Sequence, residues 1–296
     1  MTAVLQFVID VVSLGSAYAL MALGLVIVYG ILRLVNFAYG ELIMVVGYSL
    51  FLMKGSPLPW FVMAIVAVFV AILISIATDY IAFRPVRAKS VTAVLITSFA
   101  FSTLLQNAAL LFISPRPRNV PLPSVFYETI QLFDLIIPLR NLITIGMAIA
   151  LLVVFAVLMK KSILGIAMRA AATHFTMARM LGVPANLIIT TAFAISGLLA
   201  GVVALLWMGR IGTVVPTIGL EPLLIAFIAT VIGGMRSLQG AVLGGYILAL
   251  IDMSLNFTLP QDLLKFRDAF TFTAVIIILL WRPEGLIKGP ASGQRV

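Results

Sequence analysis

The residues of this sequence that could carry chemistry are few, and their spacing matches no common catalytic site. The chain has one histidine and no cysteine, which excludes a histidine-cluster metal site, thiolate chemistry and disulfides. It contains no Walker A, H-E-x-x-H or G-x-S-x-G sequence, so the motifs of nucleotide hydrolysis, zinc proteolysis and α/β-hydrolase catalysis are missing. A Ser-His-Asp triad would depend on His174, which lies in a basic stretch. We therefore predict no catalytic residue, no metal site and no cofactor in this chain.

Acidic residues near or inside apolar runs are the remaining candidates for a polar site, because a charge in hydrocarbon is costly and often functional. These residues are Asp10, Glu41, Asp79, Glu221 and Asp252. The alternative is that each acid lies near a membrane interface or at a helix end. This alternative is favoured for Asp79, which can pair with Arg84 or Arg87, and for Glu221, which precedes Pro222 at a helix start. The two interpretations stay balanced for Glu41, which follows a predicted helix break.

The elements that must position these residues are membrane-spanning helices. The chain is 63% hydrophobic and only 10% charged, whereas soluble domains carry about 25% charged residues. Its apolar runs are about 20 residues long, as a helix needs to cross a bilayer, and do not alternate in polarity as barrel strands do. The runs cover residues 4–30, 36–53, 58–83, 91–113, 136–159, 186–208, 220–234, 240–258 and 268–281. The predicted fold class is an all-α, polytopic helical membrane protein with eight to nine membrane segments, some broken or re-entrant, in a single domain over 1–296.

Two short stretches interrupt the apolar pattern and predict broken helices. One is NFAYG at 36–40, and the other is 232–240, which contains GGMRSLQG and lies between two apolar runs. Irregular backbone at membrane depth is tolerated only against protein or a wet cavity, which makes both stretches candidates for cavity-lining or hinge backbone. The alternative is that both are tight turns between helices at the membrane surface.

Residues 160–184 form a basic stretch without any acid, KKSILGIAMRAAATHFTMARMLGVP. The segment 163–181 contains no proline and many helix-forming residues, and Gly182 and Pro184 then stop a helix. We predict one short amphipathic helix, with an apolar face of Met168, Ala171, Ala172, Phe175 and Ala178 and a polar face of Arg169, Thr173, Thr176 and Arg179. Such a helix lies on anionic lipid or docks into a groove of another protein. The small alanine side chains favour docking, with Phe175 as the anchor.

The distribution of charge predicts the orientation of the chain. The net charge of +9 is scattered between apolar runs, as in a membrane protein, and is not gathered on a soluble face as in a nucleic-acid binder. If the N-terminus is outside and the chain crosses nine times, twelve of the 19 basic residues are cytoplasmic, in agreement with the positive-inside rule. The twelve are Arg33, Arg84, Arg87, Lys89, Lys160, Lys161, Arg169, Arg179, Arg236, Arg282, Lys288 and Arg295. The C-terminus is then cytoplasmic, and the proline-rich loop 114–135 is an irregular external segment.

Five ordered segments of the sequence resemble LivH-type permeases, from ABC importers of branched-chain amino acids. They are SLGSAYALMALGLVIVYGILRLVNFAYGELIMVVGY (13–48), FRPVRAKS (83–90), GIAMRAAATHFTMARMLGVPANLI (165–188), GLEPLLIAFIATVIGGMRSLQGAVLGGYILAL (219–250) and RPEGLIKG (282–289). Tyr39 departs from the family pattern, because NFAHG usually has histidine at that position. His174 and Phe175 also depart from it, because relatives commonly carry acidic or polar residues there.

The resemblance implies a non-catalytic permease subunit of the bacterial or archaeal inner membrane. Its partners would be a second, LivM-like permease, two cytoplasmic ABC ATPases that use ATP and Mg, an extracytoplasmic substrate-binding protein, and the lipid bilayer. The segment at about 160–185 would be the coupling helix that enters a groove on an ATPase, with Gly165, Met168, Arg169, Ala172, Phe175, Ala178, Leu181 and Gly182. The two predicted breaks would supply the translocation path or its hinges, with Asn36, Phe37, Gly40, Glu41, Gly233, Gly234, Ser237 and Gly240.

The sequence leaves the substrate open. The resemblance implies branched-chain amino acids or related small polar metabolites, and similar systems handle urea, short amides and aromatic acids. Two other classes of protein stay as alternatives, namely an ion-coupled secondary transporter that uses buried acids and a membrane-embedded enzyme. The basic docking segment and the scarcity of central acids favour the importer.

Overall fold

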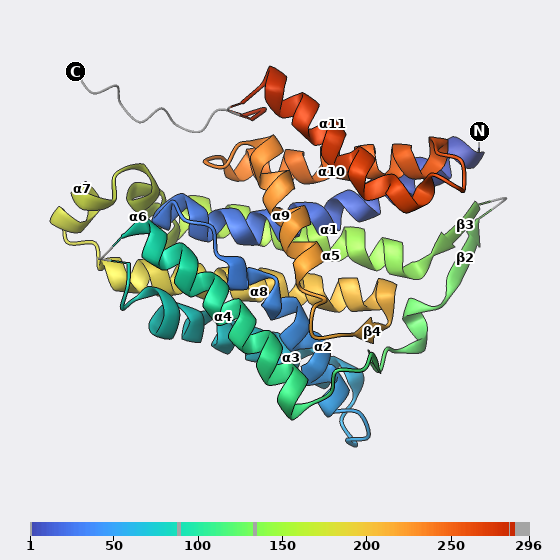
Figure 1. The fold of residues 1–296 in the computed structure, drawn as a ribbon, viewed down its shortest axis with the longest axis horizontal. Helices are drawn as coiled ribbons and strands as arrows, with labels where there is room; N and C mark the ends of the chain where they lie inside the picture. The colour runs from blue at the N-terminus through green and yellow to red at the C-terminus, as the bar shows by residue number, and fades with distance from the viewer. Residues whose placement is uncertain (1, 88–89, 133–134, 284, 288–296) are drawn as a thin grey trace. The chain divides into compact units, whose positions relative to one another are not determined.

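The computed structural model describes residues 2–87, 90–132, 135–283 and 285–287, and helices dominate it (Figure 1). Among these residues, six helices are long and apolar enough to cross a membrane. They lie in α1 (Thr2–Leu32), α3 (Trp60–Ala77), α4 (Val91–Phe112), α5 (Leu139–Lys161), α8 (Ala185–Ile211) and α10 (Leu238–Thr258). The shorter helices are α2 (Glu41–Leu52), α6 (Ile163–Thr173), α7 (Phe175–Met180), α9 (Leu220–Gly233) and α11 (Arg267–Trp281). The predicted class of a helical, polytopic protein is confirmed, while the number of membrane segments stays a prediction.

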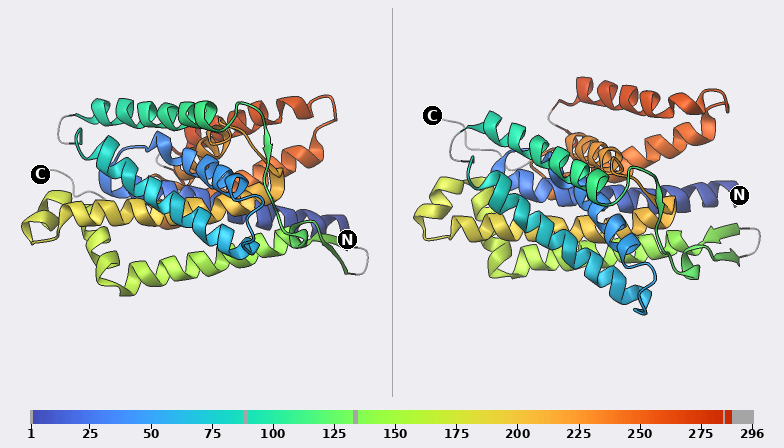
Figure 2. Two further views of the ribbon diagram at one scale, coloured as in Figure 1. Left: turned by 90° about the horizontal axis from the view of Figure 1, so that it is seen from below. Right: turned by 60° about the horizontal axis from the view of Figure 1, so that its bottom comes forward.

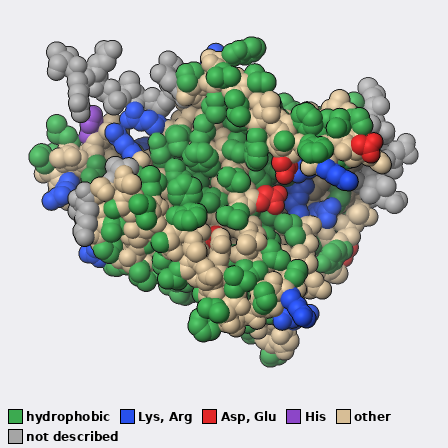
Figure 3. Space-filling model, in the orientation of Figure 1, with side chains coloured by type: hydrophobic (Ala, Val, Ile, Leu, Met, Phe, Trp, Pro, Cys, Tyr) green, Lys and Arg blue, Asp and Glu red, His purple; other side chains and the backbone are tan. Residues whose placement is uncertain are grey.

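The exposure of the long helices is that of a protein surrounded by an apolar medium. Buried residues make up 89% of the apolar segment of α1 but only 22% of those of α4 and α5. Phe69, Ile96, Leu111 and Val154 are among the exposed apolar side chains, and Figure 3 shows wide areas of hydrophobic surface. Helices that are apolar and this exposed need lipid or another protein around them. Three of the predicted cytoplasmic basic residues, Lys89, Lys288 and Arg295, lie outside the described residues.

The chain divides into two compact units, each built from separate stretches. The first unit contains Met1–Val26, Ser124–Ala150 and Ile225–Val296, and the second contains Ile27–Pro123 and Leu151–Leu224. Long helices such as α1 and α5 contribute residues to both units.

In the second unit, α3 and α8 pack against each other through small residues (Figure 2). A Cβ added to Gly197 of α8 would come within 2.7 Å of the Cβ of Ser75 in α3, so only glycine allows this approach. The Ser75 hydroxyl donates to the carbonyl oxygen of Phe193 at 2.6 Å. The rings of Phe83 and Phe193 then meet edge to face, with centroids 5.1 Å apart. This close packing holds α3 and α8 together next to the polar residues described below.

In the first unit, the glycine-rich side of α10 approaches both α1 and α9. A Cβ on Gly245 would lie 2.6 Å from the Cα of Ala19 in α1, and one on Gly244 would lie 2.7 Å from a backbone nitrogen of α9. The hydroxyls of Ser16 and Tyr246 lie 3.0 Å apart in the same interface. Small residues at such crossings let helix backbones come into contact.

The predicted external loop at 114–135 is more ordered than expected. Strand β1 (Arg118–Asn119) pairs antiparallel with β4 (Thr213–Val214), with Arg118 opposite Val214. Strand β2 (Thr129–Leu132) pairs antiparallel with β3 (Leu135–Pro138). The expectation of an irregular segment is therefore wrong in these parts, because β1 finds its partner far along the chain.

Candidate functional site

The predicted coupling segment is two helices rather than one. Ser162 caps α6, because its Oγ accepts from the amide of Gly165 at 2.9 Å. His174, with φ −143° and ψ 88°, separates α6 from α7, so the expectation of one continuous helix over 163–181 is wrong. Gly182 ends the segment with φ +85°, in the left-handed region that favours glycine, as the predicted helix stop requires.

The apolar face predicted for this segment is turned largely toward the chain itself. Met168 and Ala178 are only 1% and 4% exposed, and Ala172 and Phe175 are half-buried. Gly165 lies against the backbone at the end of α5, where no Cβ would fit. The large exposed apolar side chains are instead Ile163, Leu164, Ile166, Met177, Met180 and Leu181. Of the predicted coupling residues, Arg169, Leu181 and Gly182 are exposed, and the others pack wholly or partly within the chain.

A cleft of about 640 Å³ opens beside this segment, within the second unit. It is lined by the end of α1, the start of α8 and the residues around the turn between α6 and α7. Its basic side chains are Arg33, Arg87, His174 and Arg179, and none of the described residues that line it is acidic. Arg33 follows α1 with φ +55°, which turns the chain toward the first break. A cleft with this charge attracts acidic groups of a protein or a lipid.

Arg87 connects this cleft to a buried carboxylate. Asp79 is 1% exposed in the π-helical turn that extends α3. The Thr190 hydroxyl donates to one Asp79 oxygen at 2.7 Å, and Arg87 Nη1 lies 3.8 Å from the other. Arg87 also donates to the side chain of Asn186 in the first turn of α8. The predicted pairing of Asp79 with a nearby arginine is confirmed, and it joins α3, α8 and the cleft.

The first predicted break is a compact turn before α2. Asn36 caps the 3₁₀ turn Phe37–Tyr39, because its side-chain oxygen accepts from the amide of Ala38 at 3.0 Å. Gly40 lies so close to the carbonyl oxygen of Gly219 that no other residue would fit without movement. The break therefore brings the start of α2 against the chain just before α9, both in the second unit.

Glu41, the first residue of α2, is completely buried. Its Oε1 accepts from the Ser102 hydroxyl at 2.9 Å and from the Gln106 side-chain amide at 2.7 Å, both on α4. Its Oε2 is buried and has no hydrogen-bond partner among the described residues. Phe37 meets Phe99, one turn earlier on α4, edge to face with ring centroids 6.5 Å apart. A carboxylate held this way at one oxygen can bind a cationic group at the other.

The second predicted break, in the first unit, is a tight turn between α9 and α10. Gly233 lies against the carbonyl oxygen of Gly240, and Gly234 has φ +108°. Ser237 caps α10, because its Oγ accepts from the amide of Gly240 at 3.0 Å. The amide of Leu286 also donates to the end of α9 at 2.9 Å. These contacts fit the tight turn that was the alternative to a cavity-lining stretch.

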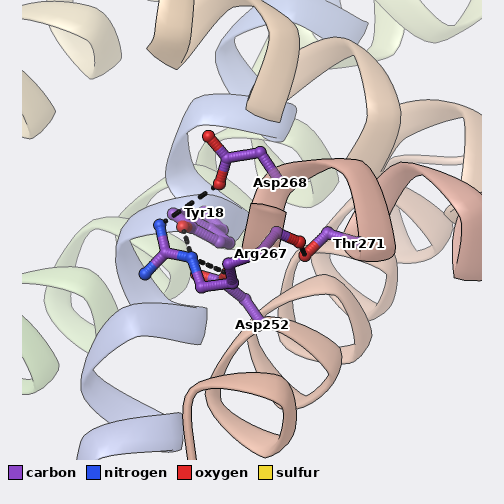
Figure 4. A network of polar contacts seen from close by, with 5 residues as sticks. All are labelled: Tyr18, Asp252, Arg267, Asp268 and Thr271. Atoms are coloured by element: carbon purple, nitrogen blue, oxygen red, sulfur yellow. Dashed lines mark hydrogen bonds and ion pairs between the residues drawn. The ribbon is translucent and has the colours of Figure 1, made fainter. Parts of the chain in front are cut away.

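Two acids of the first unit, the buried Asp252 and the half-buried Asp10, have partners in neighbouring helices. Asp252 of α10 accepts from the Tyr18 hydroxyl at 3.1 Å and lies 3.1 Å from Arg267 Nε of α11 (Figure 4). Asp10 accepts from the side chain of Asn141 at 2.8 Å. Asp252 and Arg267 therefore form an ion pair that joins α10 to α11.

The sequence did not identify Ser102 and Gln106 as the partners of Glu41. Their spacing of four residues was a signal, because it places both on one face of a helix. That spacing does not say which helix the face meets.

The fold and these sites define a polytopic helical membrane protein in which buried polar groups are held between apolar helices. Residues 7–280 match the family described as "Branched-chain amino acid transport system / permease component", and the chain therefore belongs to this family. The resemblance drawn from five sequence segments is confirmed, and the protein is a multi-pass protein of the inner membrane.

Three relatives cover almost the whole chain. The chain is 30% identical to the high-affinity branched-chain amino acid transport system permease protein BraD of Pseudomonas aeruginosa, over 97% of this chain and 96% of the relative. It is 31% identical to LivH of Escherichia coli, described in the same words, over 97% and 96%. It is 25% identical to a probable branched-chain amino acid transport permease protein LivH of Methanocaldococcus jannaschii, over 90% and 87%. No solved structure matches the chain.

Proposed function

We propose that this chain is the permease subunit of an ATP-driven importer of branched-chain amino acids. The observation that carries the proposal is the family match over residues 7–280, which includes the long helices, both breaks and the coupling segment. In this role the chain catalyses no covalent reaction and works as one permease domain over 1–296. It forms half of a translocation path that opens alternately to the two sides of the membrane.

The proposed partners are a second, LivM-like permease, two cytoplasmic ABC ATPases and an extracytoplasmic substrate-binding protein. ATP and Mg are used by the ATPases. Docking of an ATPase on α6 and α7 is supported by exposed apolar side chains such as Met177, Met180 and Leu181 beside a basic cleft. A groove in the partner can bury these side chains while its acidic groups meet Arg33 and Arg179. This arrangement has the N-terminus outside and the C-terminus in the cytoplasm.

An ion-coupled secondary transporter is the second candidate. Such a carrier needs a buried acid that is free to bind the coupling ion. Two of the buried acids in the described part of the chain, Asp79 and Asp252, are each paired with an arginine. Glu41 is buried without such a pair among the described residues, so it is the family match, and not the buried acids, that favours the ATP-driven importer.

Uptake by proteoliposomes tests the proposed function. Vesicles that contain both permeases and the ATPases should accumulate labelled L-leucine only when ATP, Mg and the loaded binding protein are supplied. Labelled urea, acetamide and an aromatic acid, offered in parallel, test the wider substrate range. Uptake driven by a proton or sodium gradient without ATP would overturn the importer and favour the carrier.

A further inference from the structure

We propose that Glu41 is the subsite that binds the positively charged amino group of the transported substrate. This inference rests on the proposed function and adds to it the residue that recognises the substrate inside the membrane.

The carboxyl group of Glu41 lies where a charge has a high free-energy cost. Its side chain is completely buried in the apolar segment Phe37–Leu52. Moving an ion out of water into such surroundings costs several kcal/mol unless hydrogen bonds and an opposite charge compensate it. No ion pair to Glu41 occurs within the described part of the chain, whereas Asp79 and Asp252 each have one.

The first oxygen of Glu41 is held by neutral donors. Ser102 and Gln106 both donate to Oε1, at 2.9 and 2.7 Å, from one face of α4. These two bonds hold the carboxyl group in place and supply no positive charge. The side chain is therefore oriented in advance, and the compensating charge has still to come from elsewhere.

The second oxygen of Glu41 is the position for that charge. Oε2 is buried and lacks a hydrogen-bond partner among the described residues. An alkylammonium group supplies N–H donors and a full positive charge, and bonds between charged groups are the strong ones. The aromatic pair of Phe37 and Phe99 joins the same turn to the same helix, so apolar side chains accompany the carboxylate. In an amino acid with an aliphatic side chain, the ammonium group would meet the carboxyl group of Glu41 and the aliphatic side chain would meet the apolar surroundings.

The main alternative is that Glu41 has only a structural role. An acid in the first turn of a helix is stabilised by the helix dipole, and α2 begins at Glu41. Glu41→Gln separates the two roles. The glutamine keeps the size of the side chain and an oxygen that can accept from Ser102 and Gln106, but it removes the charge.

The first experiment measures uptake by the complete importer in proteoliposomes. Glu41→Gln should lower the rate of L-leucine uptake by about tenfold or more, as expected when a hydrogen bond between charged groups is lost. Thermal stability in detergent should not fall, because the variant removes a costly buried charge, and co-purification of the ATPases should not change. Glu41→Asp should recover part of the uptake. The matched control is Glu128→Gln, at the exposed acid that precedes β2, which should transport like the parent.

The second experiment uses the unmodified complex and does not depend on the folding of a variant. Buried carboxyl groups are labelled with dicyclohexylcarbodiimide, and the labelled peptides are quantified by mass spectrometry. L-leucine and isoamylamine, which has the amino group but no carboxylate, should protect Glu41 from labelling. 4-Methylpentanoate, which lacks the amino group, should not protect it, and labelling of Asp252 should be the same in all samples.

The outcomes separate this inference from the proposed function. Parental uptake by Glu41→Gln, or equal protection by 4-methylpentanoate and isoamylamine, would overturn the ammonium subsite. Protection by sodium ions and not by isoamylamine would make Glu41 an inorganic cation site instead. Failure of the unmodified importer to take up any branched-chain amino acid with ATP and the binding protein would overturn the proposed function itself.

Discussion

The guanidinium of Arg87 lies 3.8 Å from the carboxylate of Asp79, which is buried at the end of α3. The same guanidinium lines the basic cleft and donates to Asn186 at the start of α8. Arg87 therefore joins the turn that follows α3 to the start of α8, at the surface beside the coupling segment.

Arg87→Met should destabilise the protein, because it leaves the carboxyl group of Asp79 buried without its cation. Removing one partner of a fully buried ion pair costs about 3–5 kcal/mol, and the loss here should be smaller because the 3.8 Å contact is not hydrogen-bonded and the guanidinium is partly exposed. The measurement is the thermal unfolding temperature of the detergent-purified protein. The double variant Asp79→Asn/Arg87→Met should recover most of the loss, because it removes the buried charge as well.

Arg84→Met is the matched control for this experiment. Arg84 is exposed, and its guanidinium lies over the ring of Tyr80 at 5.0 Å. Exposed cation–π contacts contribute about 0.5–1 kcal/mol, so the unfolding temperature should fall only slightly. Equal losses for Arg84→Met and Arg87→Met would show that the pair with Asp79 is not a stabilising contact.

Gly40→Ala should destabilise the break before α2. A Cβ at this position would meet the backbone of Gly219, which cannot move aside as a flexible side chain would. Forcing extra atoms into a packed contact costs about 1–3 kcal/mol. Gly146→Ala, on α5, is the control, because a Cβ there meets no atom within 4 Å and alanine is the better helix former. A higher unfolding temperature for Gly146→Ala and a lower one for Gly40→Ala is the expected result, measured with the same purified preparations.

The sequence is sufficient to predict the helical class and the break before Glu41, because hydropathy and the NFAYG stretch are local patterns. It is not sufficient to predict that Ser102 and Gln106 hold Glu41, because helical periodicity shows which residues share a face and not which helix that face meets. The break at His174 shows a different error of the sequence-based prediction. Propensity predicted an unbroken helix there, and the packing of Met168 and Ala178 against the chain overrides it.

Single cysteines should report the orientation of the chain, which has none of its own. Thr173→Cys, at the end of α6, should resist a membrane-impermeant thiol reagent in intact cells, and Ser124→Cys should react. Both positions are exposed, so the chain itself does not shield them, and expressing the permease without its ATPases keeps a docked partner from covering Thr173. Permeabilised cells are the control, because both variants should then react. Labelling of Thr173→Cys from outside would reverse the proposed topology. Ala88→Cys, predicted to be cytoplasmic as well, lies outside the described residues.

The exposed apolar side chains of the coupling segment should decide whether the ATPases stay bound. Leu181 is 86% exposed, and burying such a side chain in a partner contributes roughly 1.5–3 kcal/mol. Leu181→Asp should therefore weaken binding by about one to two orders of magnitude, measured as loss of the ATPases on co-purification. Phe175→Asp should weaken it too. Phe175 is half-buried within the chain, so part of that effect should appear as lower stability of the permease.

Arg169→Glu provides the comparison for these variants, because an exposed ion pair contributes only about 0–1 kcal/mol. It should retain its ATPases better than Leu181→Asp does, and both variants should still insert in the membrane and elute as one species in detergent. If Arg169→Glu loses the ATPases while Leu181→Asp keeps them, charge rather than apolar burial holds the partner. If all three variants keep their ATPases, α6 and α7 are not the docking surface, and another cytoplasmic segment must transmit the motion driven by ATP.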